Sequence, residues 1–160
     1  MPKLSAGLLL YRYQDNHLQV LLVHPAGPFW RGKDEGAWSI PKGEYEAGED
    51  AFAAALREFE EETGAPIAAA PDAFIALTPV RQPSGKVITA WAVQADFDPS
   101  TLRSNTFELE WPPHSGSTRE FAEVDRAEWF DLQTASTKIQ PGQLPLLREL
   151  AHLTANLPTF

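Results

Sequence analysis

The sequence predicts an α/β protein in which a mixed β-sheet lies between helices. Strand-like apolar runs occur both before and after one strongly patterned helix, and a second apolar helix follows near the end of the chain. At 160 residues the chain is long enough for one domain with a sizeable core and too short to expect two. We therefore expect a single domain over residues 1–160.

The first expected elements are two strands that form an antiparallel hairpin. Apolar, aliphatic-rich runs cover residues 4–13 and 18–24, and the polar residues 14–17 between them predict a turn. His24 ends the second run, where a partly exposed histidine is at least as well supported as one that binds substrate. A loop follows, and residues 38–43 then predict a short strand.

The next element is a helix over residues 50–63, the most strongly patterned segment of the chain. Asp50 can cap its first turn, and Gly64 can end it in a left-handed conformation. A mostly apolar stripe at helical spacing must pack on the sheet: Phe52, Leu56, Phe59 and Thr63. Glu58, Glu61 and Glu62 lie on another face, where they repel one another at the end of the helix that disfavours negative charge.

A solvated acidic face is the ordinary explanation of such a charge run, but it predicts no particular order of residues. The order here is Gly43, five residues, Glu49, seven residues, Arg57-Glu58, Phe59, one residue, Glu61-Glu62, one residue, Gly64. It resembles the signature of the Nudix hydrolases, G-x5-E-x7-R-E-U-x-E-E-x-G-U, where U is a bulky aliphatic residue. Every glycine, glutamate and arginine matches. Phe59 and Ala65 depart from the pattern at the two packing positions, which leaves the expected ligands unaffected.

The glutamates of this pattern suit a divalent cation. Mg²⁺ and Mn²⁺ prefer oxygen ligands and usually keep several waters and substrate phosphate oxygens. Carboxylates one helical turn apart can hold such an ion and leave positions open for a diphosphate. We therefore expect Mg²⁺, or alternatively Mn²⁺, to be held by Glu58, Glu61, Glu62 and the carbonyl oxygen of Gly43.

Two further residues complete the expected catalytic set. Nudix relatives often carry a glutamate about six residues before a late tryptophan, as a further metal ligand or as the base. Glu123 occupies that place, with Glu120 close by and loop solvation as the alternative explanation. The base stays open between Glu58 and Glu123. Arg57 lies off the glutamate face, so we expect it to orient Glu49 or one of the ligand carboxylates.

Three residues before the helix are candidate substrate contacts. The run W-S-I-P-K-G at residues 38–43 resembles the W-x-x-P-K-G run of several Nudix enzymes, notably diadenosine tetraphosphate hydrolases. Lys42 is therefore expected to contact phosphate, with an ion pair to a glutamate as the alternative. Trp30 and Lys33 could stack a nucleobase and touch phosphate. They could equally form a hydrophobic plug with a solvated neighbour.

The second half of the chain predicts further strands and two helices. Residues 74–81 and 87–97 predict a hairpin around the turn 82–85. The long polar segment 98–119, with one expected strand at 107–111, is the candidate for selecting substrate. A last short strand at Trp129-Phe130, a helix from Asp131 to about residue 137 and a terminal helix over residues 143–153 complete the expected order.

Composition limits the partners and the compartment. The net charge of −9 opposes non-specific binding to nucleic acid, so we expect no nucleic-acid partner. No apolar run approaches 18 residues, and the first residues read as a strand and not as a signal peptide, so we expect no membrane association. The absence of cysteine fits a reducing compartment, and we expect the cytoplasm. The sequence leaves the oligomeric state open.

The Nudix resemblance implies an α/β/α sandwich over nearly the whole chain and a Mg²⁺-dependent pyrophosphohydrolase. Its substrate would be a nucleoside diphosphate derivative, a small nucleotide or polyphosphate. The W-x-x-P-K-G run favours dinucleoside polyphosphates, while nucleoside triphosphates, nucleotide sugars and ADP-ribose share the same signature. Two other classes stay open: a nucleotide-sensing module without turnover, and an interaction protein whose acidic helix faces solvent.

Overall fold

The computed structural model describes residues 3–155 and contains one large sheet between helices. The strands of this sheet are β1 (Leu4–Gln14), β2 (His17–Pro25), β3 (Lys42–Tyr45), β4 (Ile75–Ala76), β5 (Val80–Arg81), β6 (Val87–Gln94) and β9 (Val124–Asp131). The α-helices are α1 (Ala51–Thr63), α2 (Leu132–Lys138) and α3 (Leu144–Ala155), and the 3₁₀ helices are η1 (Pro71–Ala73), η2 (Pro99–Thr101) and η3 (Pro141–Gln143).

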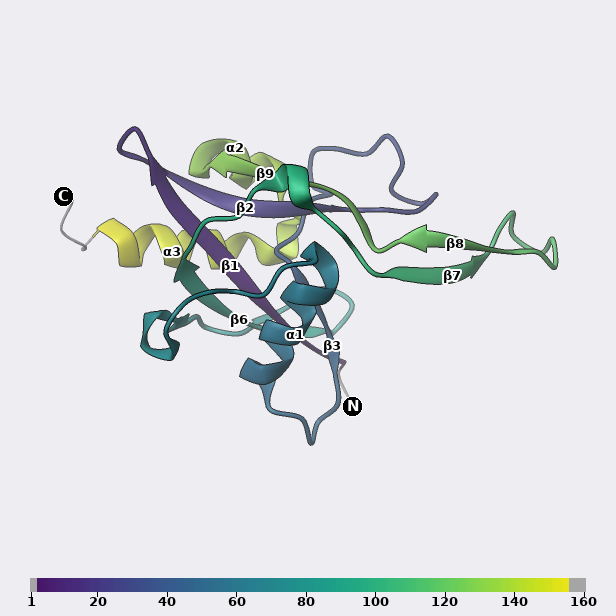
Figure 1. Ribbon diagram of the computed structural model, residues 1–160, viewed down its shortest axis with the longest axis horizontal. Coiled ribbons are helices and arrows are strands. Elements are labelled where there is room, and N and C mark those ends of the chain that lie inside the picture. Colours follow the sequence, from purple (N-terminus) through teal and green to yellow (C-terminus); the bar gives the residue numbers. More distant parts are fainter. Residues whose placement is uncertain (1–2, 156–160) are drawn as a thin grey trace.

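The sheet is seven-stranded and mixed, with the order β4-β6-β1-β2-β9, while β3 pairs with β1 and β5 with β6. The pairing of β1 with β6 is parallel, and the other pairings are antiparallel. Figure 1 shows α1 on one face of the sheet and α2 and α3 on the other. The predicted α/β/α sandwich is therefore confirmed. Within residues 3–155, no helix is long and apolar enough to cross a membrane.

On the side away from β6, the central strand β1 changes its partner along its length. This change leaves space for the segment that leads to α1. Its C-terminal part pairs with β2, whereas its N-terminal part pairs with β3. Residues 38–41 lie between β1 and β2: Leu8 donates a backbone hydrogen bond to Pro41, and Val23 and Ser39 exchange two. This segment continues directly into β3 and then into the loop before α1.

Two apolar cores lie on the two faces of the sheet because the side chains of β1 alternate between them. Ala6, Leu8 and Leu10 pack toward α1, and the side chains between them pack toward α2 and α3. Phe59 is 1% exposed in the first core and meets Phe97 edge-to-face at 6.0 Å. The aromatic residue at this packing position is therefore fully accommodated.

The predicted ends of α1 are confirmed. The Asp50 carboxylate accepts a hydrogen bond from the backbone N–H of Ala53 at 2.9 Å. Gly64 adopts a left-handed conformation with φ of 86° and donates its N–H to the carbonyl of Glu60. An asparagine could adopt the same conformation, but a Cβ at residue 64 would also approach Arg103 closely.

Three strand predictions need correction. The run 74–81 forms two short strands and not one, because Pro79 has no N–H and the N–H of Thr78 donates to the Glu149 carboxylate instead. The strand expected at 38–43 begins only at Lys42, since residues 38–41 form single bridges. The last strand is not limited to Trp129-Phe130 but is the eight-residue β9, which pairs along β2.

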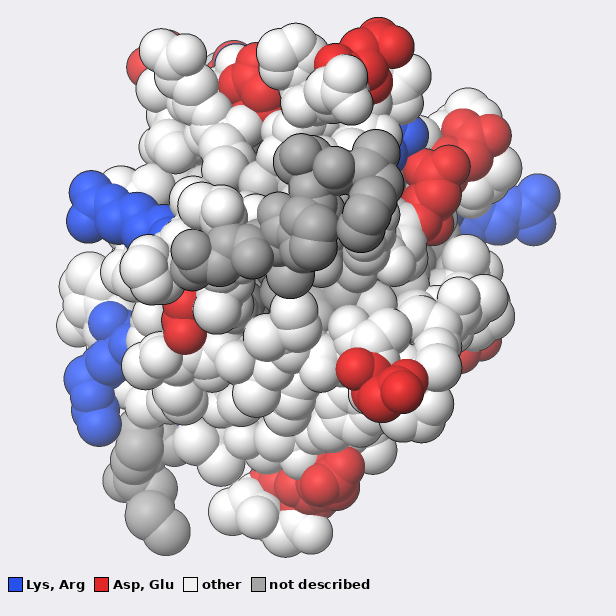
Figure 2. Space-filling model, turned by 90° about the vertical axis from the view of Figure 1, so that its left-hand side faces the viewer, with Lys and Arg blue, Asp and Glu red and all other residues white. Residues whose placement is uncertain are grey.

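The polar segment 98–119 also contains more regular structure than expected. It forms most of a separate two-stranded sheet of β7 (Thr106–Glu110) and β8 (Thr118–Ala122). We call this hairpin the arm, because it projects from the body in Figure 1. Figure 2, which views the side of the molecule away from the arm, shows charged side chains scattered among mostly uncharged ones.

Candidate active site

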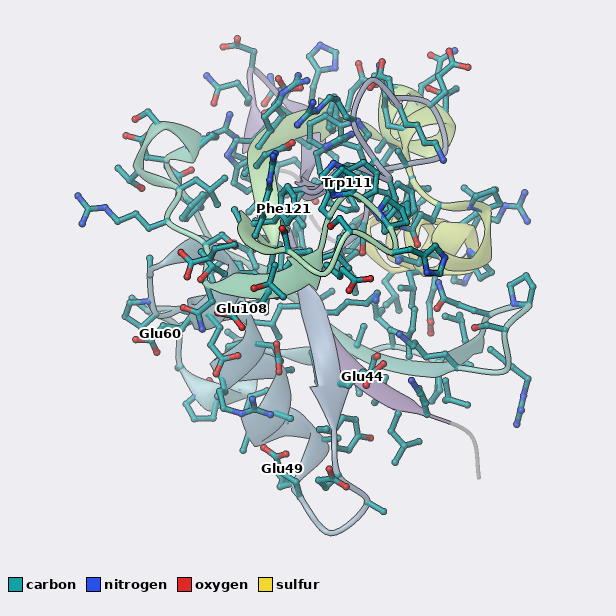
Figure 3. All side chains as sticks on the ribbon, turned by 90° about the vertical axis from the view of Figure 1, so that its right-hand side faces the viewer. Glu44, Glu49, Glu60, Glu108, Trp111 and Phe121 are labelled. Atoms are coloured by element: carbon teal, nitrogen blue, oxygen red, sulfur yellow. The ribbon has the colours of Figure 1, made fainter. Side chains whose placement is uncertain are left out.

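The site begins where α1 crosses β3. Gly43 on β3 lies against the carboxylate of Glu58, and a Cβ at position 43 would overlap that carboxylate. Glu58 is only 7% exposed, whereas Glu60, which lies outside the signature positions, is exposed on α1 (Figure 3). Burial raises the pKa of Glu58, and the neighbouring Glu61 raises it further. A simple solvated face does not explain a buried carboxylate held in this way.

Arg57 connects three carboxylates on the side of α1. Its guanidinium lies 3.0 Å from Glu49, 3.0 Å from Glu58 and 3.5 Å from Glu61. Figure 3 shows Glu49 in the loop that precedes α1, so Arg57 joins this loop to the helix. The sequence predicted that Arg57 orients Glu49 or a ligand carboxylate, and it contacts carboxylates of both groups. Its role in activity stays a prediction.

The Glu62 side chain is bound to the backbone of Lys42. The backbone N–H of Lys42 donates to the Glu62 carboxylate at 3.0 Å. Burial raises the pKa of Glu62 to about 8, and the charges of Glu123 and Glu58 act in the same direction. Burial also lowers the pKa of the Lys42 ammonium. Within the described part of the chain this ammonium forms no ion pair. The structure therefore does not support the alternative in which Lys42 forms an ion pair with a glutamate.

Glu123 reaches the site from the other end of the chain. It is the single residue between β8 and β9, and its N–H donates to the carbonyl of Asn105 at 2.9 Å and to Ser104 Oγ at 3.1 Å. Asn105 in turn donates its N–H to the carbonyl of Glu61 at 2.8 Å. Glu123 therefore lies in a short connection between two strands, and hydrogen bonds hold its backbone beside the end of α1. Burial raises the pKa of Glu123, and Glu61 contributes.

Ser104 and Asn105 are site residues that sequence reasoning missed. Both lie in a polar segment with no periodic pattern, and a serine-asparagine pair is common in any loop. The segment 103–105 also caps the C-terminal end of α1, since the N–H of Arg103 donates to the carbonyl of Thr63. No local signal in the sequence distinguishes these two residues from their neighbours.

We call Glu58, Glu61, Glu62 and Glu123 the carboxylate cluster. The charges of neighbouring members raise the pKa values of Glu58, Glu62 and Glu123 across α1 and the β8–β9 junction, a cost that a divalent cation would remove. As oriented, no three metal-binding side chains among residues 3–155 are placed to share one ion. Arg57 holds Glu61, and the Lys42 N–H holds Glu62, so coordination requires these two side chains to rotate. The donor set itself, all carboxylate oxygens, fits a hard divalent cation.

The other predicted contact residues lie in the loop after β2. Trp30 is partly buried and packs against the core between the sheet and helices α2 and α3. The Lys33 ammonium lies 5.6 Å from the centre of the Trp30 ring. Within the described residues neither side chain contacts the carboxylate cluster. This placement favours the hydrophobic plug for Trp30.

His24 is not the partly exposed residue that the sequence favoured. It is 5% exposed and meets Trp38 edge-to-face at 5.2 Å. Its ring nitrogens lie 3.0 Å from Asp125 Oδ1 and 2.6 Å from the carbonyl oxygen of Lys33. The side chain is buried because the loop folds back over the end of β2.

Solved structures with the same fold are found by comparison. The Ap4A hydrolase of C. elegans, in a binary complex, superposes with a TM-score of 0.66 at 22% identity, over 97% of this chain and 99% of that chain. The NUDIX domain of Shewanella oneidensis NrtR, complexed with ADP ribose, gives 0.65 at 20% identity, over 98% and 90%. A MutT/nudix family protein from Enterococcus faecalis gives 0.63 at 17% identity, over 97% and 63%. At these identities the likeness shows a common fold.

The family follows from the sequence. No curated protein matches the chain. The model of the NUDIX domain matches residues 1–150, nearly the whole of the part that folds into the sandwich. Members of this family are pyrophosphohydrolases that generally use divalent metal ions. The protein therefore belongs to the Nudix hydrolases.

Proposed function

We propose that the protein is a Mg²⁺-dependent pyrophosphohydrolase that cleaves a diphosphate linkage in a nucleoside diphosphate derivative. A dinucleoside polyphosphate is the favoured substrate, and a nucleoside triphosphate is the next. The observation that carries this proposal is the carboxylate cluster, in which Gly43 leaves space for Glu58 and the β8–β9 junction brings in Glu123. The substrate class is supported by structures of the same fold, which include an Ap4A hydrolase and a NUDIX domain complexed with ADP ribose.

The cluster residues Glu58, Glu61 and Glu62, with the Gly43 carbonyl and Glu123, would hold the Mg²⁺. The bound cation would neutralise charge on the phosphate oxygens and acidify the attacking water. Mn²⁺ has the same preference for oxygen ligands and could replace it.

The protein's own residues supply the remaining steps. Water attacks phosphorus, the bridging P–O bond breaks, and one carboxylate accepts the proton of the water. Glu58 and Glu123 are the two candidates for this base, since burial raises the pKa of both and so makes each a better proton acceptor. Arg57 holds Glu58 and Glu61 in orientation, and the unpaired Lys42 ammonium would contact a phosphate oxygen.

The proposal extends to the setting of the reaction. We expect residues 1–160 to act as one domain with a small nucleotide as partner, without nucleic acid or membrane. The absence of cysteine supports a reducing compartment such as the cytoplasm.

The experiment is a substrate panel. The protein is incubated with diadenosine tetraphosphate, nucleoside triphosphates, nucleotide sugars and ADP-ribose, each with Mg²⁺, and products are identified by mass. Cleavage between phosphates supports the proposal. Tight binding without any product would instead favour a nucleotide-sensing module on the same scaffold.

A further inference from the structure

A second hollow lies beside Glu123 and outside the carboxylate cluster. It has a volume of about 400 Å³ and lies between residues 27–34 of the loop after β2 and the segment 121–126. The two walls are joined, because the N–H of Ala26 donates to the carbonyl of Glu123 at 3.0 Å. We call this hollow the loop pocket. One of its walls is thus the same chain segment that carries Glu123 into the active site.

The loop pocket is rich in positive charge although the protein has a net charge of −9. Arg31, Lys33 and Arg126 line it. Arg126 pairs with Glu128 at 2.8 Å, but within residues 3–155 neither Arg31 nor Lys33 pairs with a carboxylate. The Lys33 ammonium lies instead 5.6 Å from the centre of the Trp30 ring. Two cations without a carboxylate partner on one concave surface favour an anionic ligand.

The two acids of the loop pocket are already bound to other groups. Asp34 accepts from the indole N–H of Trp38 at 2.8 Å and pairs with Lys138. Asp125 lies 3.0 Å from Nδ1 of His24. Lys138 offsets the charge of Asp34, and Asp125 alone does not balance the three cations Arg31, Lys33 and Arg126, so the loop pocket keeps an excess of positive charge.

The loop that forms the pocket is held in place by its own contacts. Both ring nitrogens of the buried His24 lie within hydrogen-bonding distance of an oxygen, the Lys33 carbonyl at 2.6 Å and Asp125 Oδ1 at 3.0 Å, which ties the loop to the end of β2 and to the start of β9. Turns from Gly27 to Trp30 and from Trp30 to Lys33 close with backbone hydrogen bonds of 3.2 Å and 3.1 Å. The backbone that carries Arg31 and Lys33 is thus held in a folded loop.

Aromatic side chains lie beside the cations. Phe121 lines the loop pocket and packs on Phe107 with ring centres 6.0 Å apart. Phe29, which is 59% exposed, meets Trp111 edge-to-face at 5.6 Å and joins the loop to the arm. In Figure 3 Phe121 and Trp111 lie on one side of the arm, and Glu108 lies on the other, nearer to α1. An aromatic ring in a basic hollow is a suitable surface for a nucleobase.

We propose that the loop pocket binds a nucleoside 5′-phosphate and holds the second nucleotide of a dinucleoside polyphosphate while the carboxylate cluster acts on the polyphosphate. Arg31 and Lys33 contact its phosphate, and Phe121 stacks its base. The role in catalysis rests on the proposed function. The binding itself does not, because the pocket uses none of the metal-binding carboxylates.

Binding of AMP, measured by calorimetry in EDTA, tests the site alone. AMP is expected to bind the wild type and Glu61→Gln with the same affinity. The double variant Arg31→Gln/Lys33→Gln should weaken binding by about tenfold or more, since each charge-assisted hydrogen bond is worth roughly a factor of ten. Arg119→Gln, which removes an exposed cation of β8 outside the pocket, is the matched control and should change nothing.

Two results would overturn the binding proposal. One is AMP binding that requires Mg²⁺ or that the double variant retains. The other is inorganic phosphate binding as tightly as AMP, which would show an anion site without a base subsite. If the double variant does not fold, Arg31→Gln and Phe121→Leu are measured singly, and each should weaken AMP binding.

Kinetics then test the assignment to the second nucleotide. The double variant should raise KM for diadenosine tetraphosphate about tenfold and raise KM for ATP by a smaller factor, because ATP has no second nucleotide to place in the loop pocket. An equal loss for both substrates would contradict the assignment. If the wild type cleaves no substrate, the proposed function fails, and the AMP titration still decides whether the loop pocket is a nucleotide site.

Discussion

The Glu58 carboxylate lies directly against the Cα of Gly43, in the space that a side chain at position 43 would occupy. The backbone of Gly43 does not need a positive φ, so glycine is required here for space and not for conformational freedom. Helix α1 can therefore bring a buried carboxylate up to β3. Gly43 and Glu58 of the signature therefore form one steric unit.

Gly43→Ala should reduce activity far more than stability. The new Cβ would displace the end of the flexible Glu58 side chain and leave the backbone in place, so kcat should fall by about 10²-fold or more. The melting temperature should change by only a few degrees. Gly48→Ala is the matched control, since a Cβ at residue 48 meets nothing within 4 Å. Full activity in Gly43→Ala would contradict the role given to Glu58.

The metal-free protein should lose stability as pH rises. The pKa of Glu62 is about 8 in the folded protein against 4.5 as its ordinary value, so the folded state holds an extra proton between these values. The free energy of unfolding therefore falls as pH rises through this window. Thermal melting in EDTA from about pH 5 to about pH 8.5 should show a steeper fall for the wild type than for Glu62→Gln. Added Mg²⁺ should restore stability at the upper end, and identical slopes in EDTA would show that Glu62 is not the cause.

The fold was predictable because its signals are local and periodic. The caps at Asp50 and Gly64, the buried run of β1 and the turn after it all follow from short-range patterns that the structure confirms. Pro79 is a local signal for the break between β4 and β5, but the sequence does not show that the N–H of Thr78 donates to Glu149 on a distant helix. Most of β9 was also not predicted, because its length is set by pairing with β2, which is distant in the sequence.

The site was only partly predictable for a related reason. The spacing of the signature identifies the residues that α1 places together, Glu58 and Glu61 among them. It contains no information on Ser104 and Asn105, which fix Glu123 through backbone hydrogen bonds. It also did not indicate that the histidine at the end of β2 would be buried under the loop.

Trp30→Ala should destabilise the fold. Trp30 packs against the apolar core, so its truncation should cost about 1–3 kcal/mol of unfolding free energy. The measurement is chemical denaturation, with substrate KM as a second readout. Unchanged stability with a KM raised about tenfold or more would instead show that Trp30 stacks on the substrate base.

Glu123→Gln should separate a base from a ligand. If Glu123 accepts the proton of the attacking water, kcat should fall by about 10²–10⁴-fold at every Mg²⁺ concentration. If it only helps to hold the ion, raising Mg²⁺ should recover kcat, because mass action refills a weakened site. A Mg²⁺ titration of kcat therefore decides the matter. Full rescue would leave Glu58 as the base, and no defect at any concentration would move the question to Glu120.

The carboxylate cluster as a Mg²⁺-dependent centre is tested most directly by the turnover of diadenosine tetraphosphate with Mg²⁺, with EDTA, and in Glu61→Gln and Glu62→Gln. Wild-type turnover should require Mg²⁺. Each variant should lower turnover by about 10²-fold or more. The melting temperature of each variant without metal should equal that of the wild type or be slightly higher. The melting temperature should not fall, because Glu61→Gln removes repulsion between carboxylates, and Glu62→Gln replaces a group that keeps its proton below about pH 8 in the folded protein. Turnover that persists in EDTA, or that both variants retain in full, would contradict the assignment.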